Sequence, residues 1–298
     1  MLEFYALYIF SMLLSSLNSV YLYKKFQLTA GTSLQANTMY LIINGVVSAI
    51  VPGILMIARG QPLECTPYSL IVALIIMVCA AANTAAQLKA YSLGKIATVN
   101  ILATVGSIIL SCAWGVLVLR ETLTFFDVIA IGLMLLSTLL IRGTDQGGKQ
   151  GKGILWLYGL VILFSSIISI LNKQHQVEAT FETVDTLSFS VWIGIIRTVI
   201  FTGVALIILA KSGKSAFAFS RASVGYATAS SVISGSCYII TLFTGTVLPI
   251  VVTSPLGTGL GIIMSSILPW VFYKEKLTRK QIIGILFSLS GAILFLVG

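Results

Sequence analysis

The chain has 298 residues, of which 57% are hydrophobic and only 9% are charged, and its formal net charge at pH 7 is +9. A soluble domain carries about 25% charged residues, so this composition excludes a water-soluble protein. The apolar stretches reach the roughly 20 residues that a membrane-spanning helix needs and exceed the roughly ten-residue strands of a membrane barrel. We therefore expect an all-α protein embedded in a lipid bilayer.

Ten apolar stretches follow one another, each bounded by charged residues, glycine or proline. We expect a membrane-spanning helix over each of them, with the limits Phe4–Tyr23, Ser33–Ala58, Pro67–Leu88, Ile96–Leu119, Phe125–Ile141, Gly153–Leu171, Val184–Ala210, Ala222–Phe243, Val247–Tyr273 and Gln281–Val297. The longest polar interruption, "RGTDQGGKQGKG", has the composition of a linker. We expect two five-helix halves, residues 1–142 and 153–298, joined by a linker of residues 143–152.

Lysine and arginine are distributed unevenly between the loops. Loops after odd-numbered stretches hold fourteen of these residues, whereas loops after even-numbered stretches hold three, Arg59, Arg120 and Lys173. Loops rich in Lys and Arg stay in the cytoplasm, so the pattern places both termini outside and indicates a multi-pass protein of the cytoplasmic membrane. The positive charge thus needs no nucleic acid as a partner.

The chain contains two similar phrases, "VLRETLTFFDVIAIGLMLLSTLLI" from Val118 and "FYKEKLTRKQIIGILFSLSGAILFL" from Phe272. An offset of 154 residues pairs Glu121 with Glu275 and also aligns the residues that follow. Similar segments recur throughout, which indicates an internal repeat of five spans. Because five is odd, the second copy enters the membrane from the opposite side, so we expect two inverted repeats.

Both phrases contain a start signal for the helix that follows. Thr124 with Asp127, and Thr278 with Gln281, have the spacing of an N-cap whose partner lies three residues on. Two interpretations of Glu121 and Glu275 remain open. They belong to this start signal alone, or they form a salt bridge or a gate latch at the membrane rim.

Several polar residues are candidates to line a cavity. The fourth stretch carries Asn100 and three hydroxyl residues on one helix face, and the ninth stretch has a similar face at the same offset. Serine and threonine in membrane helices are explained equally well by close packing. Asn and Gln are costlier to bury and favour a hydrated cavity. The candidates for solute contact are Asn18, Asn83, Gln87, Asn100, Tyr238 and Thr241.

Arg197 lies near the middle of the seventh stretch, where an arginine costs about 2.5–3.5 kcal/mol. No acidic residue lies deep in any stretch to neutralise it. Two interpretations remain open. In the structural one, Arg197 bonds backbone carbonyls freed by a kinked neighbouring helix or reaches a rim acid such as Asp185. In the functional one, it binds a carboxylate or phosphate of a solute, which a guanidinium matches bidentately. Trp192 and Tyr40, paired by an offset of 152, suit the aromatic walls of a cavity or ordinary core packing.

No catalytic chemistry is indicated. The four cysteines lie apart and His175 is the only histidine, so neither a metal site, a disulfide framework nor a nucleophile pair is expected. The segment "KSGKS" at Lys211 lacks the first glycine of a phosphate-binding loop. We expect no enzyme activity, no cofactor and no ATP coupling.

The five-span repeat, with the pattern [RK]-E-x-L-T before the last span of each half, resembles the EamA family of the drug/metabolite transporter superfamily. The resemblance covers nearly the whole chain. It implies ten helices, a cavity lined mainly by helices 1–4 and 6–9, and transport without ATP. Family members often have both termini in the cytoplasm, whereas the charge distribution here predicts termini outside.

We therefore expect a secondary transporter that moves a small polar metabolite, such as an amino-acid-like solute or an organic acid, by alternating access. One alternative is efflux of amphipathic drugs. Another, from a different class, is a membrane-embedded lipid-modifying or non-transport protein. The expected partners are a small solute and the bilayer, and a homodimer stays open.

Overall fold

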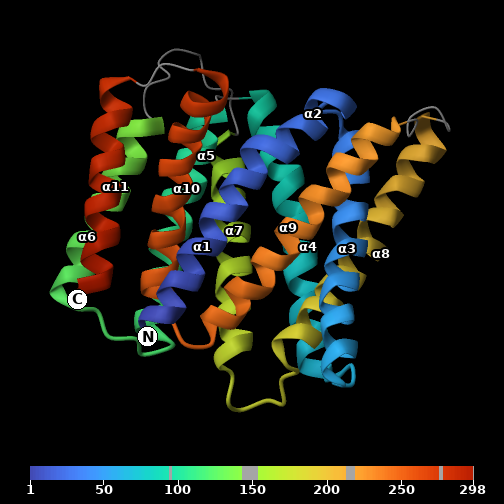
Figure 1. The fold of residues 1–298 in the computed structure, drawn as a ribbon, viewed down its shortest axis with the longest axis horizontal. Helices are drawn as coiled ribbons and strands as arrows, with labels where there is room; N and C mark the ends of the chain where they lie inside the picture. The colour runs from blue at the N-terminus through green and yellow to red at the C-terminus, as the bar shows by residue number, and fades with distance from the viewer. Residues whose placement is uncertain (94–95, 143–153, 213–218, 275–277, 298) are drawn as a thin grey trace. The chain divides into compact units, whose positions relative to one another are not determined.

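The computed structural model describes residues 1–93, 96–142, 154–212, 219–274 and 278–297, and every regular element in these ranges is a helix (Figure 1). In chain order the elements are α1 (Leu2–Asn18), η1 (Ser19–Tyr23), α2 (Lys24–Ala30), α3 (Leu34–Arg59), α4 (Pro67–Leu93), α5 (Ile96–Leu117), α6 (Phe125–Arg142), α7 (Ile154–Val177), α8 (Thr186–Ser212), α9 (Arg221–Gly245), α10 (Ile250–Tyr273) and α11 (Arg279–Val297).

The prediction of an all-helical membrane protein is confirmed. A helix lies over each of the ten apolar stretches; α1 and η1 together cover the first, and α2 continues the helix beyond it. Seven helices in the described ranges are long and apolar enough to cross a membrane. They adopt helical structure because lipid offers the backbone no hydrogen-bond partner, so each span must satisfy its own N–H and C=O groups.

Some helix ends differ from the predicted limits. Helix α7 continues to Val177, six residues beyond the predicted end at Leu171. Lys173, which we had assigned to a loop, is therefore part of α7, and its side chain is only 8% exposed. The polar sequence "NKQHQ" after Leu171 suggested a loop, but these side chains find hydrogen-bond partners within the protein.

The first apolar stretch contains a segment of π-helix, η1, which the hydrophobic pattern did not predict. A π-helical turn closes i→i+5 hydrogen bonds and accommodates an extra residue, and such turns are frequent near functional sites. Here η1 follows directly after the buried Asn18. The change of helical period turns the residues after Asn18 to a different face from the one that a continuous α-helix would give them.

Both predicted capping boxes are confirmed. The Asp127 carboxylate accepts from the Thr124 amide at 2.8 Å, while the Thr124 hydroxyl accepts from the Asp127 amide at 3.2 Å. At the start of α11, Thr278 and Gln281 make the same reciprocal pair at 2.8 Å and 3.3 Å. The caps form because the first amides of a helix have no partner within the helix.

Replacing Thr124 with Ala is expected to destabilise the protein by about 1 kcal/mol, because the Asp127 amide loses its acceptor. The effect is measured as a lower midpoint of thermal unfolding in detergent. Thr29→Ala is the matched control, since the Thr29 hydroxyl is exposed and bonds only carbonyls of its own helix. Equal shifts for the two variants would contradict a capping role.

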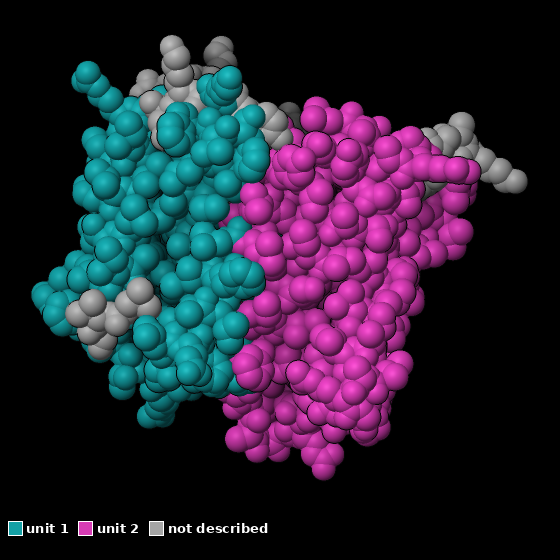
Figure 2. Space-filling model, viewed as in Figure 1, with its two compact units in different colours: residues 1–13, 79–174, 244–298 teal, residues 14–78, 175–243 magenta. Residues whose placement is uncertain are grey.

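The described chain divides into two compact units (Figure 2). Unit 1 comprises residues 1–13, 79–174 and 244–298, and unit 2 comprises residues 14–78 and 175–243. The four boundaries fall inside α1, α4, α7 and α9. Each unit thus takes segments from both predicted halves, so the units are distinct from the proposed repeats. The predicted linker, residues 143–152, lies outside the described residues.

In unit 1, α6 packs along α11, and α10 contacts both of them and α5 (Figure 1). Buried Met134 of α6 and Leu256 of α10 belong to the core between these helices. Small residues permit close approach: a Cβ atom at Gly291 of α11 would lie 3.0 Å from the Ala130 carbonyl oxygen. This packing of small residues is the usual means by which membrane helices associate.

In unit 2, α3 and α8 lie side by side and form its most extensive helix pair (Figure 1). Both helices have local start signals. The Ser33 hydroxyl accepts from the Ala36 amide at 3.2 Å, and the Asp185 carboxylate accepts from the amides of Leu187 and Ser188. Helix α3 ends at Arg59 and is followed by Gly60, whose φ of +64° is the left-handed conformation that favours glycine.

Candidate functional site

Arg197 of α8, in unit 2, is a charged residue near the middle of a candidate span. It lies eleven positions after the first residue of α8 and fifteen before the last, which at 1.5 Å per residue is roughly 17 Å and 22 Å along the helix. The side chain is partly buried. No ion pair of Arg197 is found in the described part of the chain, so its charge is balanced neither by Asp185 nor by any other described acid. Asp185 instead caps α8.

The guanidinium donates from Nη1 to the Oδ1 atom of Asn44 on α3. Asn44 is only 5% exposed. Since arginine has donors and no acceptor, the carbonyl end of the amide must face Arg197. The hydrogen-bond partner of Arg197 is thus neutral, and no acid in the described residues compensates the positive charge of the pair.

Two glycines explain why Asn44 and Arg197 meet. A Cβ atom at Gly45 would lie 2.5 Å from the Thr198 hydroxyl, and a Cβ atom at Gly194 would lie 2.5 Å from the Ala49 amide nitrogen. Without side chains at these positions, the backbones of α3 and α8 approach closely. Asn44 precedes Gly45 and Arg197 precedes Thr198, so both side chains leave the helices at this contact.

A second set of polar groups connects α1, α3 and α9 of unit 2. The Tyr40 hydroxyl lies 3.0 Å from the Ser230 hydroxyl. Asn18 donates from Nδ2 to the Ser230 carbonyl at 3.1 Å and to the Ser234 hydroxyl at 2.8 Å. Because a carbonyl only accepts, these bonds determine the orientation of the Asn18 amide. Its Oδ1 atom is enclosed and has no partner in the described residues.

Aromatic groups accompany these polar ones. The Tyr40 ring lies edge-on to Tyr23 at 4.7 Å and tilted to Phe26 at 5.3 Å, measured between ring centroids. Tyr40 and Tyr238 are both within electrostatic range of the Arg197 guanidinium. We call Asn18, Tyr40, Asn44, Arg197, Ser230, Ser234 and Tyr238 the Arg197 cluster. It combines a cation, amides, hydroxyls and aromatic rings, which are the groups that orient a small polar solute.

Of the predicted solute-contacting residues, Arg197, Asn18 and Tyr238 belong to this cluster. Trp192 lies on the same helix, α8, but its indole Nε1 donates to the Glu64 carbonyl at 2.9 Å, in the loop that follows α3. Thr241 donates back to the Cys237 carbonyl of its own helix at 2.9 Å. Asn44 was not among the predicted residues, although it directly precedes Gly45, which the offset of 152 pairs with Arg197.

The other predicted residues belong to unit 1. Asn83 of α4 donates from Nδ2 to the Ser165 hydroxyl of α7 at 3.2 Å, and its Oδ1 atom is enclosed without a partner in the described residues. Gln87 lies one turn further along α4 and is partly buried. Asn100 lies on α5, but its side chain is outside the described residues.

Glu121 is a helix cap in the structure. Its carboxylate accepts from the amides of Ile250 and Val251, at the start of α10, at 2.9 Å and 3.1 Å. Lys173 lies 3.8 Å from the same carboxylate and donates to the carbonyls of Gly245 and Leu248 at 2.8 Å and 2.7 Å. Both side chains are nearly buried, at 12% and 8% exposure. The salt bridge between Glu121 and Lys173 is one of the two interpretations that the sequence left open for the rim glutamates. Glu275 lies outside the described residues.

These contacts attach α10 to the rest of unit 1. Pro255 has no amide hydrogen, so the Val251 carbonyl lacks its helical donor. The Cys112 thiol donates to that carbonyl at 3.8 Å, and the Tyr8 hydroxyl donates to the Thr253 carbonyl at 2.6 Å. The first turns of α10 are thus held by side chains from α1, from α5 and from the loop between α5 and α6.

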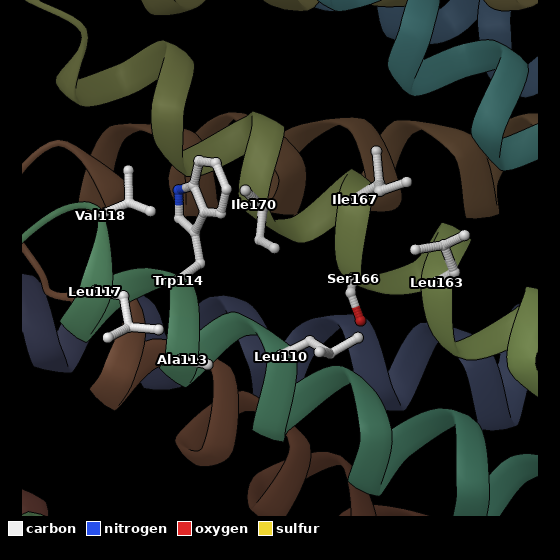
Figure 3. Close-up of a pocket in the computed structure, with 9 residues that line it drawn as sticks. All are labelled: Leu110, Ala113, Trp114, Leu117, Val118, Leu163, Ser166, Ile167 and Ile170. Carbon is white, nitrogen blue, oxygen red and sulfur yellow. The ribbon is translucent and has the colours of Figure 1, made fainter.

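A groove of about 270 Å³ lies between α5 and α7 of unit 1 (Figure 3). Its lining residues are Leu110, Ala113, Trp114, Leu117, Val118, Leu163, Ser166, Ile167 and Ile170. The Ser166 hydroxyl donates to the Ile162 carbonyl at 2.7 Å, and Trp114 donates to Gln174 at 3.3 Å. The polar atoms of the lining are thus engaged, and the groove offers little to orient a polar solute.

No group of three metal-ligating side chains occurs in the described residues.

The His175 side chain is buried, with only 2% of its surface exposed. Its Nε2 atom lies 2.8 Å from the Ser69 hydroxyl, and its ring stacks on Phe189 with 3.6 Å between the ring centroids. The Ser69 hydroxyl also accepts from the Val184 amide at 3.1 Å. Ser69 at the start of α4 thus connects to the end of α7 through His175 and to the loop before α8 through Val184.

No protein-family model and no curated protein matches the chain. A solved structure described only as "Crystal structure of protein" is similar, with a TM-score of 0.77 over 99% of this chain and 98% of that chain, at 13% sequence identity. At this identity the similarity shows the fold alone. The fold is thus shared over nearly the full length of both chains.

Proposed function

We propose that the protein is a secondary transporter that moves a small polar metabolite across the cytoplasmic membrane without ATP. The observation that carries the proposal is the pair of Arg197 with neutral Asn44 inside a candidate span. An unneutralised arginine at this depth is costly, and such residues in transporters commonly lie on solute pathways. The cluster around it supplies further hydrogen-bonding groups for a solute that carries a carboxylate or phosphate.

The pairing of helices supports an inverted repeat of two five-helix halves. Helix α3 packs on α8, and α6 packs on α11, which are the second with the seventh and the fifth with the tenth predicted spans. An internal two-fold relation between halves would bring equivalent spans together in this way. Transporter folds built from inverted repeats bind their solute near the midplane of the bilayer. The resemblance to the EamA family points to the same architecture.

A second candidate is efflux of amphipathic drugs. The aromatic group of Tyr23, Phe26 and Tyr40 favours it, because the faces of aromatic rings attract cations. Arg197 opposes it, since a buried cation repels a cationic drug. A lipid-modifying activity would need an accessible reactive group near the membrane surface, whereas the hydrogen-bonded side chains of Ser69 and His175 are both buried.

Solute counterflow tests the proposal. The full-length protein is reconstituted into liposomes loaded with unlabelled carboxylate, phosphate, neutral or cationic solutes, and entry of the labelled solute is measured. We expect exchange of an anionic class, without ATP. Absence of flux for every class, relative to protein-free liposomes, would contradict transport. Flux of bulky cations alone would favour drug efflux.

The loops of unit 2 support termini outside the cell. The loops that follow α3 and α7 hold Glu64, Glu178, Glu182 and Asp185, and they meet, because Glu64 accepts from the Asp185 amide at 3.2 Å. The regions after even-numbered stretches hold three basic residues against fourteen after odd-numbered ones, which favours an outside location for these loops.

Cys65 gives a direct test of this orientation. It is exposed in the loop between α3 and α4, whereas Cys79 and Cys237 are buried. A membrane-impermeant maleimide is expected to label intact cells, and Cys65→Ser is expected to remove the label. Labelling only after the membrane is permeabilised would place this loop and both termini on the cytoplasmic side.

A further inference from the structure

The pair of Asn44 and Arg197 has donors left over. Arg197 has five N–H groups, and the one hydrogen bond found for it in the described residues goes to Asn44. With the amide carbonyl turned to Arg197, the Nδ2 group of Asn44 points away from the guanidinium. Arg197 is partly exposed, whereas Asn44 is only 5% exposed. The spare donors of the guanidinium are therefore the ones open to a ligand.

The charge of the pair is +1, because the guanidinium stays protonated and the amide is neutral. An aspartate at position 44 would have the same shape and would reduce the net charge to zero. In a medium of low dielectric constant, an uncompensated charge is costly. A ligand with one negative charge brings the total to zero. A dianion leaves −1, and a zwitterion or a neutral solute leaves +1.

We propose that Asn44 determines the charge specificity of this site, which takes a small monocarboxylate. The two carboxylate oxygens match the fork of the guanidinium. This inference rests on the proposed transport function and defines its solute class. Asn44 is a specificity-determining residue because its neutrality leaves the arginine charge available to the solute.

The test uses the full chain in detergent and the midpoint of thermal unfolding with two matched sets of probes. The first set is propionate, propionamide, propylamine and the dianion malonate, and the second is benzoate, benzamide, benzylamine and phthalate. We expect the two monocarboxylates to stabilise the wild-type protein most. In Asn44→Asp their apparent affinity is expected to fall roughly 10- to 100-fold, the scale of a hydrogen bond to a charged group.

Two controls separate binding from folding. Without ligand, Asn44→Asp is expected to unfold at the wild-type midpoint or above, because the new carboxylate pairs with Arg197. Asn44→Ser, which stays neutral, is expected to keep the preference for monocarboxylates with weaker binding. Equal affinity of Asn44→Asp for propionate or benzoate, a preference for the dianions, or no stabilisation by either monocarboxylate would overturn the proposal.

Flux in liposomes distinguishes this inference from the function on which it rests. If monocarboxylates bind as expected but are not transported, the transport function is wrong and the charge specificity holds. If solutes are transported with no difference between wild type and Asn44→Asp, the charge specificity is wrong and transport holds.

Discussion

Replacing Arg197 with Gln is expected to abolish anion-dependent flux and to weaken anion binding by at least roughly 30-fold. Removing one partner of a desolvated, hydrogen-bonded charge pair costs about 2–5 kcal/mol of binding free energy, which corresponds to this factor or more. Glutamine still bonds the Asn44 amide, but it offers neither the charge nor the planar fork of the guanidinium. Flux into liposomes and the ligand-induced shift of the unfolding midpoint measure the loss.

This substitution is not expected to unfold the protein. A buried arginine costs about 2.5–3.5 kcal/mol at the centre of a membrane helix, so its removal should leave the ligand-free midpoint unchanged or raise it. Arg197→Lys keeps the charge without the fork and should bind weakly. Arg59→Gln, at the exposed end of α3, is the matched control. Unchanged flux in Arg197→Gln would show that Arg197 is structural.

The second large effect is expected at Lys173. Lys173→Ala should destabilise the protein by about 3–5 kcal/mol, because removing one member of a buried ion pair leaves the other charge uncompensated. The carbonyls of Gly245 and Leu248 also lose the donor that they share. The change is measured by thermal or denaturant unfolding in detergent, with exposed Lys211→Ala as the control.

A double-mutant cycle separates the ion pair from the cap. Glu121→Gln replaces one oxygen with an NH₂ group that would face the amide of Ile250 or Val251, so it should destabilise even without a loss of the lysine. Glu121→Gln combined with Lys173→Ala should cost less than the sum of the two. Strict additivity would mean that Glu121 acts only as a cap of α10, with no contribution from its charge pairing to Lys173.

Features that depend on neighbouring residues could be predicted from the sequence. The ten helical stretches follow from apolar runs long enough to cross a bilayer, since any such run must satisfy its backbone internally. The capping boxes of Thr124 and Thr278 were predicted correctly because each joins groups only three residues apart. Arg197 was recognised as unusual because its depth in an apolar run is visible without a structure.

The tertiary structure alone decided which distant residues meet. Asn44 and Arg197 are 153 positions apart, and their contact depends on the close approach of α3 and α8 at Gly45 and Gly194. Glu121 reaches the start of α10 and the side chain of Lys173, although hydropathy assigned both charged residues to loops. Hydrophobicity determines that a span forms a helix, whereas the shapes and hydrogen bonds of facing side chains determine its neighbours, its rotation and therefore the site.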